Sequence, residues 1–288
     1  MEQEKPNVTV VIVPRERFSV AIQSLESVLQ TTKYPYDLVY VDGGYPDPVR
    51  GQIERASREH GFGLIRSDQY LTPNRARNLG FQAVETPYVV FIDNDVVVAP
   101  GWLEKLVECA EETGAAIVGP LYLIGRPEDR IIHMAGGSAG IREQGGERVM
   151  YEEHRFEDRN MDEVDDQLRR EPTDLVEFHC MLIRSQVLTE LGPLDEGLHS
   201  ASEHLDISLL ARQAGYQVYL EPESMVTYVT SGGFEGFDLP YYHLRWSDDW
   251  NQRSMARLQE KWNINDEYGT MMLRWLTAHR NLAPSQPT

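Results

Sequence analysis

The sequence predicts an α/β fold in which a mostly parallel central sheet is flanked by helices. Apolar strand-like segments and amphipathic helical segments alternate about four times before residue 120. The strand-like segments are nearly continuous apolar runs, which is typical of parallel strands buried on both faces. Residues 126–173 are rich in glycine and charged residues and have weak periodicity, which predicts an irregular, partly β insertion. A helical extension is expected to follow the sheet.

Each element of the first half is justified by its own signals. Residues 8–13 (VTVVIV) are nearly all β-branched and predict a buried strand, and apolar residues recur at helical spacing over 18–29. Thr72 followed by Pro73 is a favourable helix start, and Gly61 and Gly114 are typical helix ends. The remaining strands are expected at 37–41, 64–65, 88–92 and 115–118, and the remaining helices at 48–60, 72–85 and 100–112.

The second half is less regular. An apolar segment resumes at 175–183 and precedes a short helix that begins at Ser185 and ends at Gly192. Ser200 and Glu203 have capping-box spacing and open a helix that runs to residue 214. A strand is expected at 216–220, an aromatic-rich loop from 234 and a polar helix over 248–261, whereas the tail at 281–288 is expected to be disordered.

Composition excludes several classes of protein. The formal net charge is −19, with 46 acidic against 27 basic residues, which argues against nucleic-acid binding and against a long stay on an anionic membrane. No apolar run is long enough to span a bilayer, and the N-terminus lacks a leader-like apolar core. Cys109 and Cys180 are the only cysteines, and we expect buried thiols in a reducing compartment. The expected location is the cytoplasm, without stable membrane insertion.

Acidic residues follow two of the predicted strands. Asp42 ends one of them, and Asp93-Asn94-Asp95 interrupts the apolar run of another. Ligands of open α/β sheets bind at the carboxyl ends of strands, and a hard divalent cation takes carboxylate and phosphate oxygens there. The pattern therefore indicates a cation site. A turn is the alternative interpretation, because Asp and Asn favour turns.

A second group of candidates opens the helix that begins near residue 203. Glu203 and Asp206 lie on one helix face, and His204 is beside them, so each is a candidate general base. The alternative is that these acids only stabilise the helix N-terminus. The chain has no dinucleotide-binding glycine motif, no P-loop and no zinc spacing among its eight histidines.

Six segments, taken in order, resemble the family 2 glycosyltransferases of the GT-A fold. They are VTVVIV, LVYVDGG, NRARNLGFQAV, VVFIDNDVVVAPGWLEKLV, MLIRSQVLTELGPLDEGL and EHLDISLLARQAGY, and the resemblance covers about residues 8–228. It implies a glycosyltransferase domain over 1–230, with a nucleotide-sugar half (1–120) and an acceptor-side half (121–230). Residues 231–280 would form a lid or helical extension.

The resemblance implies roles for the acidic residues. Asp95 would hold Mg²⁺ or Mn²⁺ on the donor diphosphate, with Asp93 as a further ligand. The other donor-binding residues implied are Pro14, Arg15, Asp42, Gly43, Arg77, Asn78, Asp93 and Asn94. Arg15 stands where the family commonly has a different turn; it could neutralise diphosphate charge or be a surface arginine.

Three positions depart from the family pattern. His204 stands where the family has its aspartate base, so His204, Glu203 or Asp206 is the expected base. Tyr228 stands where a late histidine often binds the metal, and His204 or His243 could replace it. Trp246 and Tyr242 are expected on the acceptor side, or else pack the last helix onto the body.

The implied reaction is a single displacement with inversion, from a nucleotide-sugar donor to a glycan, lipid-linked or small-molecule acceptor, as in polysaccharide biosynthesis. A nucleotidyltransferase is one alternative. However, the loop rich in glycine and basic residues that is usual in that class is absent after the first strand. A nucleotide-sugar-binding protein that has lost its base is another alternative.

Overall fold

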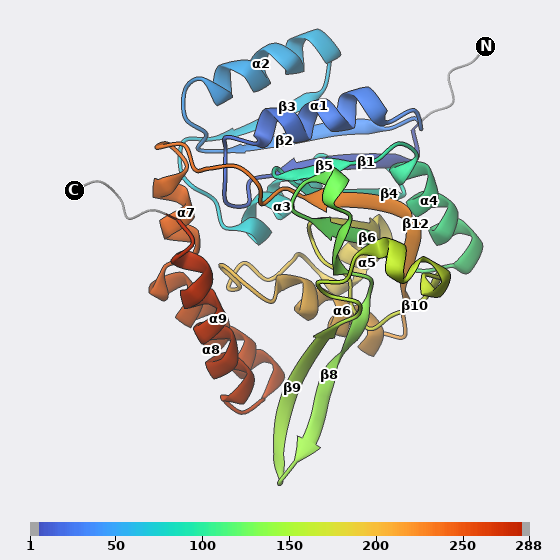
Figure 1. The fold of residues 1–288 in the computed structure, drawn as a ribbon, viewed down its shortest axis with the longest axis vertical. Coiled ribbons are helices and arrows are strands. Elements are labelled where there is room, and N and C mark those ends of the chain that lie inside the picture. Colours follow the sequence, from blue (N-terminus) through green and yellow to red (C-terminus); the bar gives the residue numbers. More distant parts are fainter. Residues whose placement is uncertain (1–5, 284–288) are drawn as a thin grey trace.

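A ten-stranded mixed sheet forms the centre of the computed structural model, which describes residues 6–283 (Figure 1). Its strands follow the order β10-β12-β6-β11-β4-β1-β2-β3, while β5 pairs with β12 and β7 with β6. The neighbours β4, β1, β2 and β3 are mutually parallel, and β12 is parallel to β6. The sheet is therefore mostly parallel, as predicted. The antiparallel pairs are formed by β5, β7, β10 and β11.

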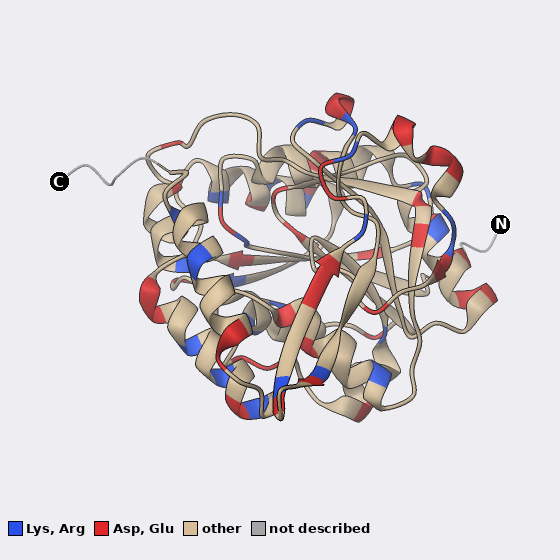
Figure 2. Cartoon of the chain, turned by 60° about the horizontal axis from the view of Figure 1, so that its bottom comes forward, with Lys and Arg blue, Asp and Glu red and all other residues tan. Residues whose placement is uncertain are grey.

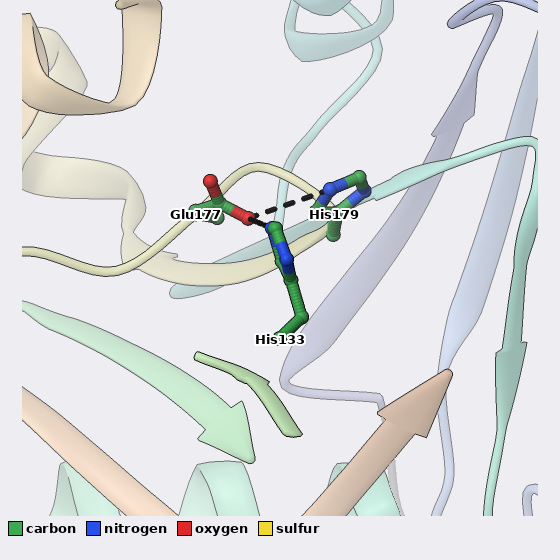
Figure 3. A group of neighbouring side chains, drawn as sticks. All are labelled: His133, Glu177 and His179. Atoms are coloured by element: carbon green, nitrogen blue, oxygen red, sulfur yellow. Dashed lines mark ion pairs between the residues drawn. The ribbon is translucent and has the colours of Figure 1, made fainter. Parts of the chain in front are cut away.

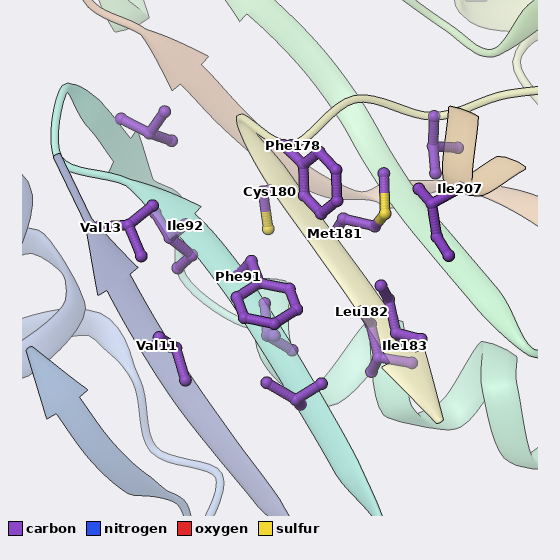
Figure 4. Packing of buried hydrophobic residues seen from close by; sticks show 14 of the residues in the cluster. Val11, Val13, Phe91, Ile92, Phe178, Cys180, Met181, Leu182, Ile183 and Ile207 are labelled. Atoms are coloured by element: carbon purple, nitrogen blue, oxygen red, sulfur yellow. The ribbon is translucent and has the colours of Figure 1, made fainter. Parts of the chain in front are cut away.

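The strands of the first half match the apolar runs. They are β1 (Val8–Val13), β2 (Asp37–Gly43), β3 (Gly63–Ser67), β4 (Tyr88–Asp93), β5 (Val96–Val98) and β6 (Ile117–Ile124). Every residue of β1 and β4 is buried, because helices cover both faces of this part of the sheet. Figure 4 shows Phe91 of β4 between Val11 of β1 and Leu182 of the antiparallel strand β11 (Cys180–Arg184). The short strand β5 was not predicted.

The helices of the body begin and end close to the expected signals. They are α1 (Ala21–Thr31), α2 (Val49–His60), α3 (Pro73–Phe81), α4 (Trp102–Thr113), α5 (Ser185–Leu191) and α6 (Glu203–Gln213). Gly61 and Gly114 follow α2 and α4 with φ angles of 74° and 73°, which glycine adopts without a Cβ clash. Helix α3 ends four residues before the predicted position. Both cysteines are buried free thiols, as expected.

The insertion at 126–173 is more regular than its composition suggests. It contains β7 (Ile131–Met134) and a long hairpin made of β8 (Gly137–Gln144) and β9 (Glu147–His154), which projects from the body. The remaining strands are β10 (Glu171–Pro172) and β12 (Val218–Tyr228), and β12 continues past the predicted end at residue 220 across a register shift. The hairpin strands GSAGIREQ and ERVMYEEH do not alternate apolar and polar residues, so the sequence lacked the period-2 signal of a strand.

Three helices pack along one side of the body after residue 238 (Figure 1). They are α7 (Leu239–Arg245), α8 (Asp248–Trp262) and α9 (Glu267–Arg280), of which only α8 was placed from the sequence. Helix α8 begins at Ser247, whose hydroxyl accepts the Trp250 N–H. Of the tail that we expect to be disordered, residues 284–288 lie outside the described residues.

Charged residues of both signs share the surface. Figure 2 shows lysine and arginine interspersed with aspartate and glutamate along the C-terminal helices. Within residues 6–283, no helix combines the length and the apolar character needed to cross a bilayer.

Substituting Gly80 is expected to destabilise the fold, because α3 packs closely on β1. A Cβ at Gly80 would lie 2.3 Å from Val11 Cγ1, so Gly80→Ala should lower the free energy of unfolding by about 1–3 kcal/mol in urea titrations. Gly51→Ala in α2 is the matched control, since its Cβ would meet nothing closer than 3.6 Å. Gly51→Ala should raise the free energy of unfolding by up to about 1 kcal/mol, because alanine has a higher helix propensity than glycine. Equal effects of the two substitutions would contradict this packing.

Candidate active site

The Asp93-Asn94-Asp95 triplet forms the turn between β4 and β5, and the turn is buried. Asp93 receives one guanidinium on each carboxylate oxygen, from Arg15 and from Arg77, both at 3.0 Å. The Asn94 Oδ1 atom accepts the Arg15 backbone N–H at 2.9 Å, and its amide donates to the Arg17 carbonyl. The triplet is thus a turn, as the alternative interpretation proposed, but a buried one in which Asp93 and Asn94 join the loop after β1 to the end of β4.

Asp95 differs from its neighbours because its carboxylate has no partner. The side chain is fully buried, and neither oxygen makes a hydrogen bond within the described part of the chain. Burial, together with the negative charge of Glu16, raises the pKa of Asp95 well above its ordinary value. One ligand atom each from Asp93, Asp95 and His179 lies within 4.8 Å of the others. A buried carboxylate without a hydrogen bond, beside two such groups, suits a bound cation.

Asp42 lies at the same edge of the sheet, on the other side of β1 from Asp93. Its carboxylate accepts the backbone N–H groups of Gly44 and Tyr45, at 3.1 and 2.8 Å. Arg50 pairs with it at 3.3 Å, yet burial raises the pKa of this carboxyl above its ordinary value. The neighbouring Gly43 faces Pro14, since a Cβ on Gly43 would lie 2.7 Å from the proline ring.

Arg77 connects the strand end to helix α6. Besides Asp93, the buried guanidinium approaches Glu203 Oε1 to 3.7 Å, and it lies over the Phe178 ring at 3.8 Å. Asn78 faces elsewhere: its amide donates to the Leu194 carbonyl at 2.9 Å. Arg77 therefore links Asp93 at the end of β4 to Glu203 at the start of α6.

The three candidate bases on α6 point in different directions. Asp206 faces α8, where it accepts hydrogen bonds from Lys261 (2.7 Å) and Trp262 (2.9 Å). Glu203 lies between Arg77 and Arg245; burial opposes its ionisation, but the two guanidinium groups lower its pKa overall. A carboxylate held between two cations is a weak base. Of the three residues, His204 alone has no arginine or lysine partner among its recorded contacts, although the charge of the nearby His154 acts on it.

His204 pairs instead with a residue from the insertion. Its Nε2 atom lies 2.7 Å from Glu152 Oε1 on β9, and the other oxygen of Glu152 accepts the Tyr268 hydroxyl at 2.7 Å. Burial lowers the pKa of His204, but the charge of Glu152 outweighs burial and raises it overall. The hairpin thereby supplies a carboxylate to the histidine that replaces the expected aspartate, a contact that the sequence did not predict.

A histidine cluster was also missed. His133, Glu177 and His179 converge beside the strand ends (Figure 3), and Glu152, His154 and His204 form a neighbouring group. The histidines show no zinc spacing in the sequence because these residues are spread over β7, β9, the loop before β11 and α6. Only the tertiary fold gathers them.

The remaining predicted residues lie on α7 and just after it. Trp246 is buried and donates its indole N–H to Glu16 at 2.9 Å, and Tyr242 donates its hydroxyl to the His279 carbonyl at 2.7 Å. These contacts agree with the alternative that both residues pack the C-terminal helices onto the body. His243 belongs to none of the three potential ligand groups found within residues 6–283, and its metal role stays a prediction.

Comparison with known proteins agrees with this fold. The structure resembles a crystal structure of GalNAc-T7 with UDP, GalNAc and Mn²⁺, with a TM-score of 0.61 at 18% identity. The match covers 98% of this chain and 55% of GalNAc-T7. The fold is therefore that of the GT-A glycosyltransferases. The family model described as glycosyl transferase family 2 matches residues 9–192, and the chain belongs to this family.

Relatives of similar sequence are longer proteins. The chain is 26% identical over 277 residues to the uncharacterized protein y4gI of Sinorhizobium fredii, which covers 91% of this chain and 28% of that protein. It is 27% identical over 223 residues to the pre-mycofactocin glycosyltransferase of Mycobacterium tuberculosis, covering 77% of this chain and 42% of that protein. The chain thus spans less than half the length of either relative. The family match favours the glycosyltransferase interpretation over the nucleotidyltransferase alternative.

Proposed function

We propose that this chain transfers a sugar from a nucleoside-diphosphate sugar to an acceptor hydroxyl, with inversion and with dependence on Mg²⁺ or Mn²⁺. The observation that carries the proposal is the buried, unpartnered carboxylate of Asp95 at the strand end of a family 2 fold. UDP and Mn²⁺ in the GalNAc-T7 structure support a nucleotide donor and a divalent cation here.

The donor side can be derived from the residues at the strand ends. Asp95, with Asp93 as a neighbour, would hold the cation, which when bound supplies positive charge to the diphosphate leaving group. Arg15 lies at this edge with a partly accessible guanidinium, 3.0 Å from Asp93, and adds positive charge on the same side. Asp42, Gly43 and Pro14 would border the nucleoside.

The acceptor side is assigned to α6 and the insertion. His204 would take the proton from the attacking hydroxyl, and Glu152 would orient the imidazole and stabilise its charged form, as a carboxylate does for a catalytic histidine. Glu203 and Asp206 would then be positioning residues, because their carboxylates already bind cationic side chains. Glycan, lipid-linked and small-molecule acceptors remain the candidates, in polysaccharide or small-molecule glycosylation in the cytoplasm.

The test is sugar transfer, or donor hydrolysis, across a panel of nucleotide-sugars with Mn²⁺. His204→Ala should lower kcat/KM by roughly 100-fold or more, which is typical of a general base. A chain that binds nucleotide-sugars but never turns them over, with any acceptor, would be the lapsed binding protein instead. Activity lost in Glu203→Gln but kept in His204→Ala would move the base to Glu203.

The pH dependence separates catalysis from structure. Because Glu152 raises the pKa of His204, we expect kcat/KM to rise with pH through an apparent pKa above 6.5. Glu152→Gln removes the anion that stabilises the imidazolium, so this limb should move to lower pH while the plateau rate falls. An unchanged pH profile in Glu152→Gln would show that Glu152 does not act on the base. Glu153→Gln, at the next position of β9, is the matched control.

A further inference from the structure

Three potential metal ligands converge beside the donor site, and one of them, His179, also borders that site through its other ring nitrogen. Figure 3 shows the carboxylate of Glu177 directed between the imidazoles of His133 and His179. Its Oε2 atom lies 3.0 Å from His133 Nε2 and 3.4 Å from His179 Nε2. We propose that these three side chains bind a divalent transition metal such as Zn²⁺, at a site separate from that of the donor cation. This inference does not rest on the proposed function.

The spacing of the donor atoms suits a tetrahedral ion. With Zn–N and Zn–O bonds near 2.0–2.1 Å, two ligands of a tetrahedral site lie roughly 3.3–3.4 Å apart. The separation of Glu177 from His179, 3.4 Å, matches that value, and the separation from His133, 3.0 Å, is somewhat shorter. The rings of His133 and His179 cross at 78°, so the imidazoles do not simply stack. Two histidines and one glutamate, with a fourth position open, form a familiar zinc ligand set.

The polar groups are better explained by an ion than by hydrogen bonds alone. Glu177 Oε2 is buried and makes no hydrogen bond of acceptable geometry, so its close contacts with His133 and His179 are satisfied only when the rings are protonated or a cation lies between them. An unsatisfied buried carboxylate oxygen is costly, and a cation would satisfy it. The neighbouring Glu152 is different, because His154, His204 and Tyr268 already contact its two oxygens. The group of Glu152, His154 and His204 can therefore be held together by protonated histidines, without a metal ion.

The surroundings hold these ligands in place. The Tyr122 hydroxyl accepts the Glu177 backbone N–H at 3.0 Å and contacts the carbonyls of Glu177 and Cys180, which fixes the segment that carries two ligands. His179 turns its other nitrogen, Nδ1, toward Asp93 at 3.5 Å. Metal-bound histidines commonly direct their second nitrogen to a carboxylate. With His179 bound through Nε2, Asp95 stays available to the donor cation.

The experiment uses the full chain without an affinity tag, stripped of metal with a chelator and titrated with Zn²⁺ alone. Calorimetry and elemental analysis should find one equivalent of Zn²⁺ without any nucleotide, and thermal unfolding should shift upward. His133→Ala and Glu177→Gln should each weaken Zn²⁺ binding by roughly 100-fold or more. The matched controls are Asp95→Asn, which alters the donor site, and His60→Ala, which removes an exposed histidine; both should bind as the parent does.

Two outcomes would overturn the site. One is a parent chain that binds no Zn²⁺, or binds it equally well after His133→Ala and Glu177→Gln. The other is binding that disappears in Asp95→Asn but persists in Glu177→Gln, which would place the ion at the donor site. Circular dichroism of the metal-free variants shows whether each folds. Since sugar transfer is not measured, failure here is distinct from failure of the proposed function.

Discussion

Asp95→Asn is expected to abolish metal-dependent sugar transfer while making the metal-free protein more stable. The substitution removes the charge that the cation requires, so kcat should fall by at least roughly 100- to 1,000-fold. It also replaces a buried carboxylate that has no partner, and the free energy of unfolding should rise by about 1–3 kcal/mol without metal. Activity with Mn²⁺ and urea unfolding in chelator measure the two effects.

The gain in stability should depend on pH in a defined direction. The folded pKa of Asp95 is raised above 3.8, so the folded state holds this proton more tightly than the unfolded state does. The penalty is therefore absent in acid and grows as the pH rises above about 3.8. The advantage of Asp95→Asn should be larger at pH 7 than at pH 4. Asp47→Asn, on the surface, should change neither activity nor stability, and full activity in Asp95→Asn would refute the donor-cation role.

Glu16→Gln is expected to loosen the C-terminal helices. Glu16 is buried beside Arg15 and accepts hydrogen bonds from Tyr228 and from Trp246, while His279 of α9 lies 3.3 Å away. One carboxylate thus joins the loop after β1 to β12, to Trp246 after α7 and to α9. Removing one charge from a buried pair commonly costs several kcal/mol, so we expect a loss of about 3 kcal/mol in urea unfolding at pH 7.

This loss should diminish in acid. Burial opposes ionisation of Glu16, but His279 and Arg15 outweigh it and lower the pKa below its ordinary value of 4.5. A carboxyl with a lowered folded pKa contributes its stability above the unfolded pKa, and that stability is lost as the pH falls through the folded value. The difference between parent and Glu16→Gln should therefore shrink below about pH 4.5. Glu104→Gln, at an exposed position of α4, is the control and should change the free energy of unfolding by no more than about 0.5 kcal/mol. A pH-independent difference would show that the charge of Glu16 is not what holds the helices.

Some residues of the site can be predicted from local sequence patterns, whereas the roles of others depend on contacts with distant parts of the chain. Asp42 and Asp93 were predicted to be site residues because each ends an apolar run, and the strand ends of a parallel sheet meet at one edge. The roles of Glu203, His204 and Asp206 could not be ranked from spacing, because helix periodicity does not say which partner each side chain meets. Arg245, Glu152 and Lys261, the partners that separate them, come from three other elements.

What the sequence by itself determined is the sheet of buried strands and its acidic edge, since apolar runs, helix caps and glycine stops act over a few neighbouring residues. Only the tertiary structure decided that Asp95 lacks a partner, that His204 faces Glu152, and that His133, Glu177 and His179 converge. The placement of helix α9 and the buried packing of Trp246 were also decided only by the tertiary structure. Each depends on contacts between residues far apart in the chain, and long-range contacts leave no periodic pattern in a single sequence.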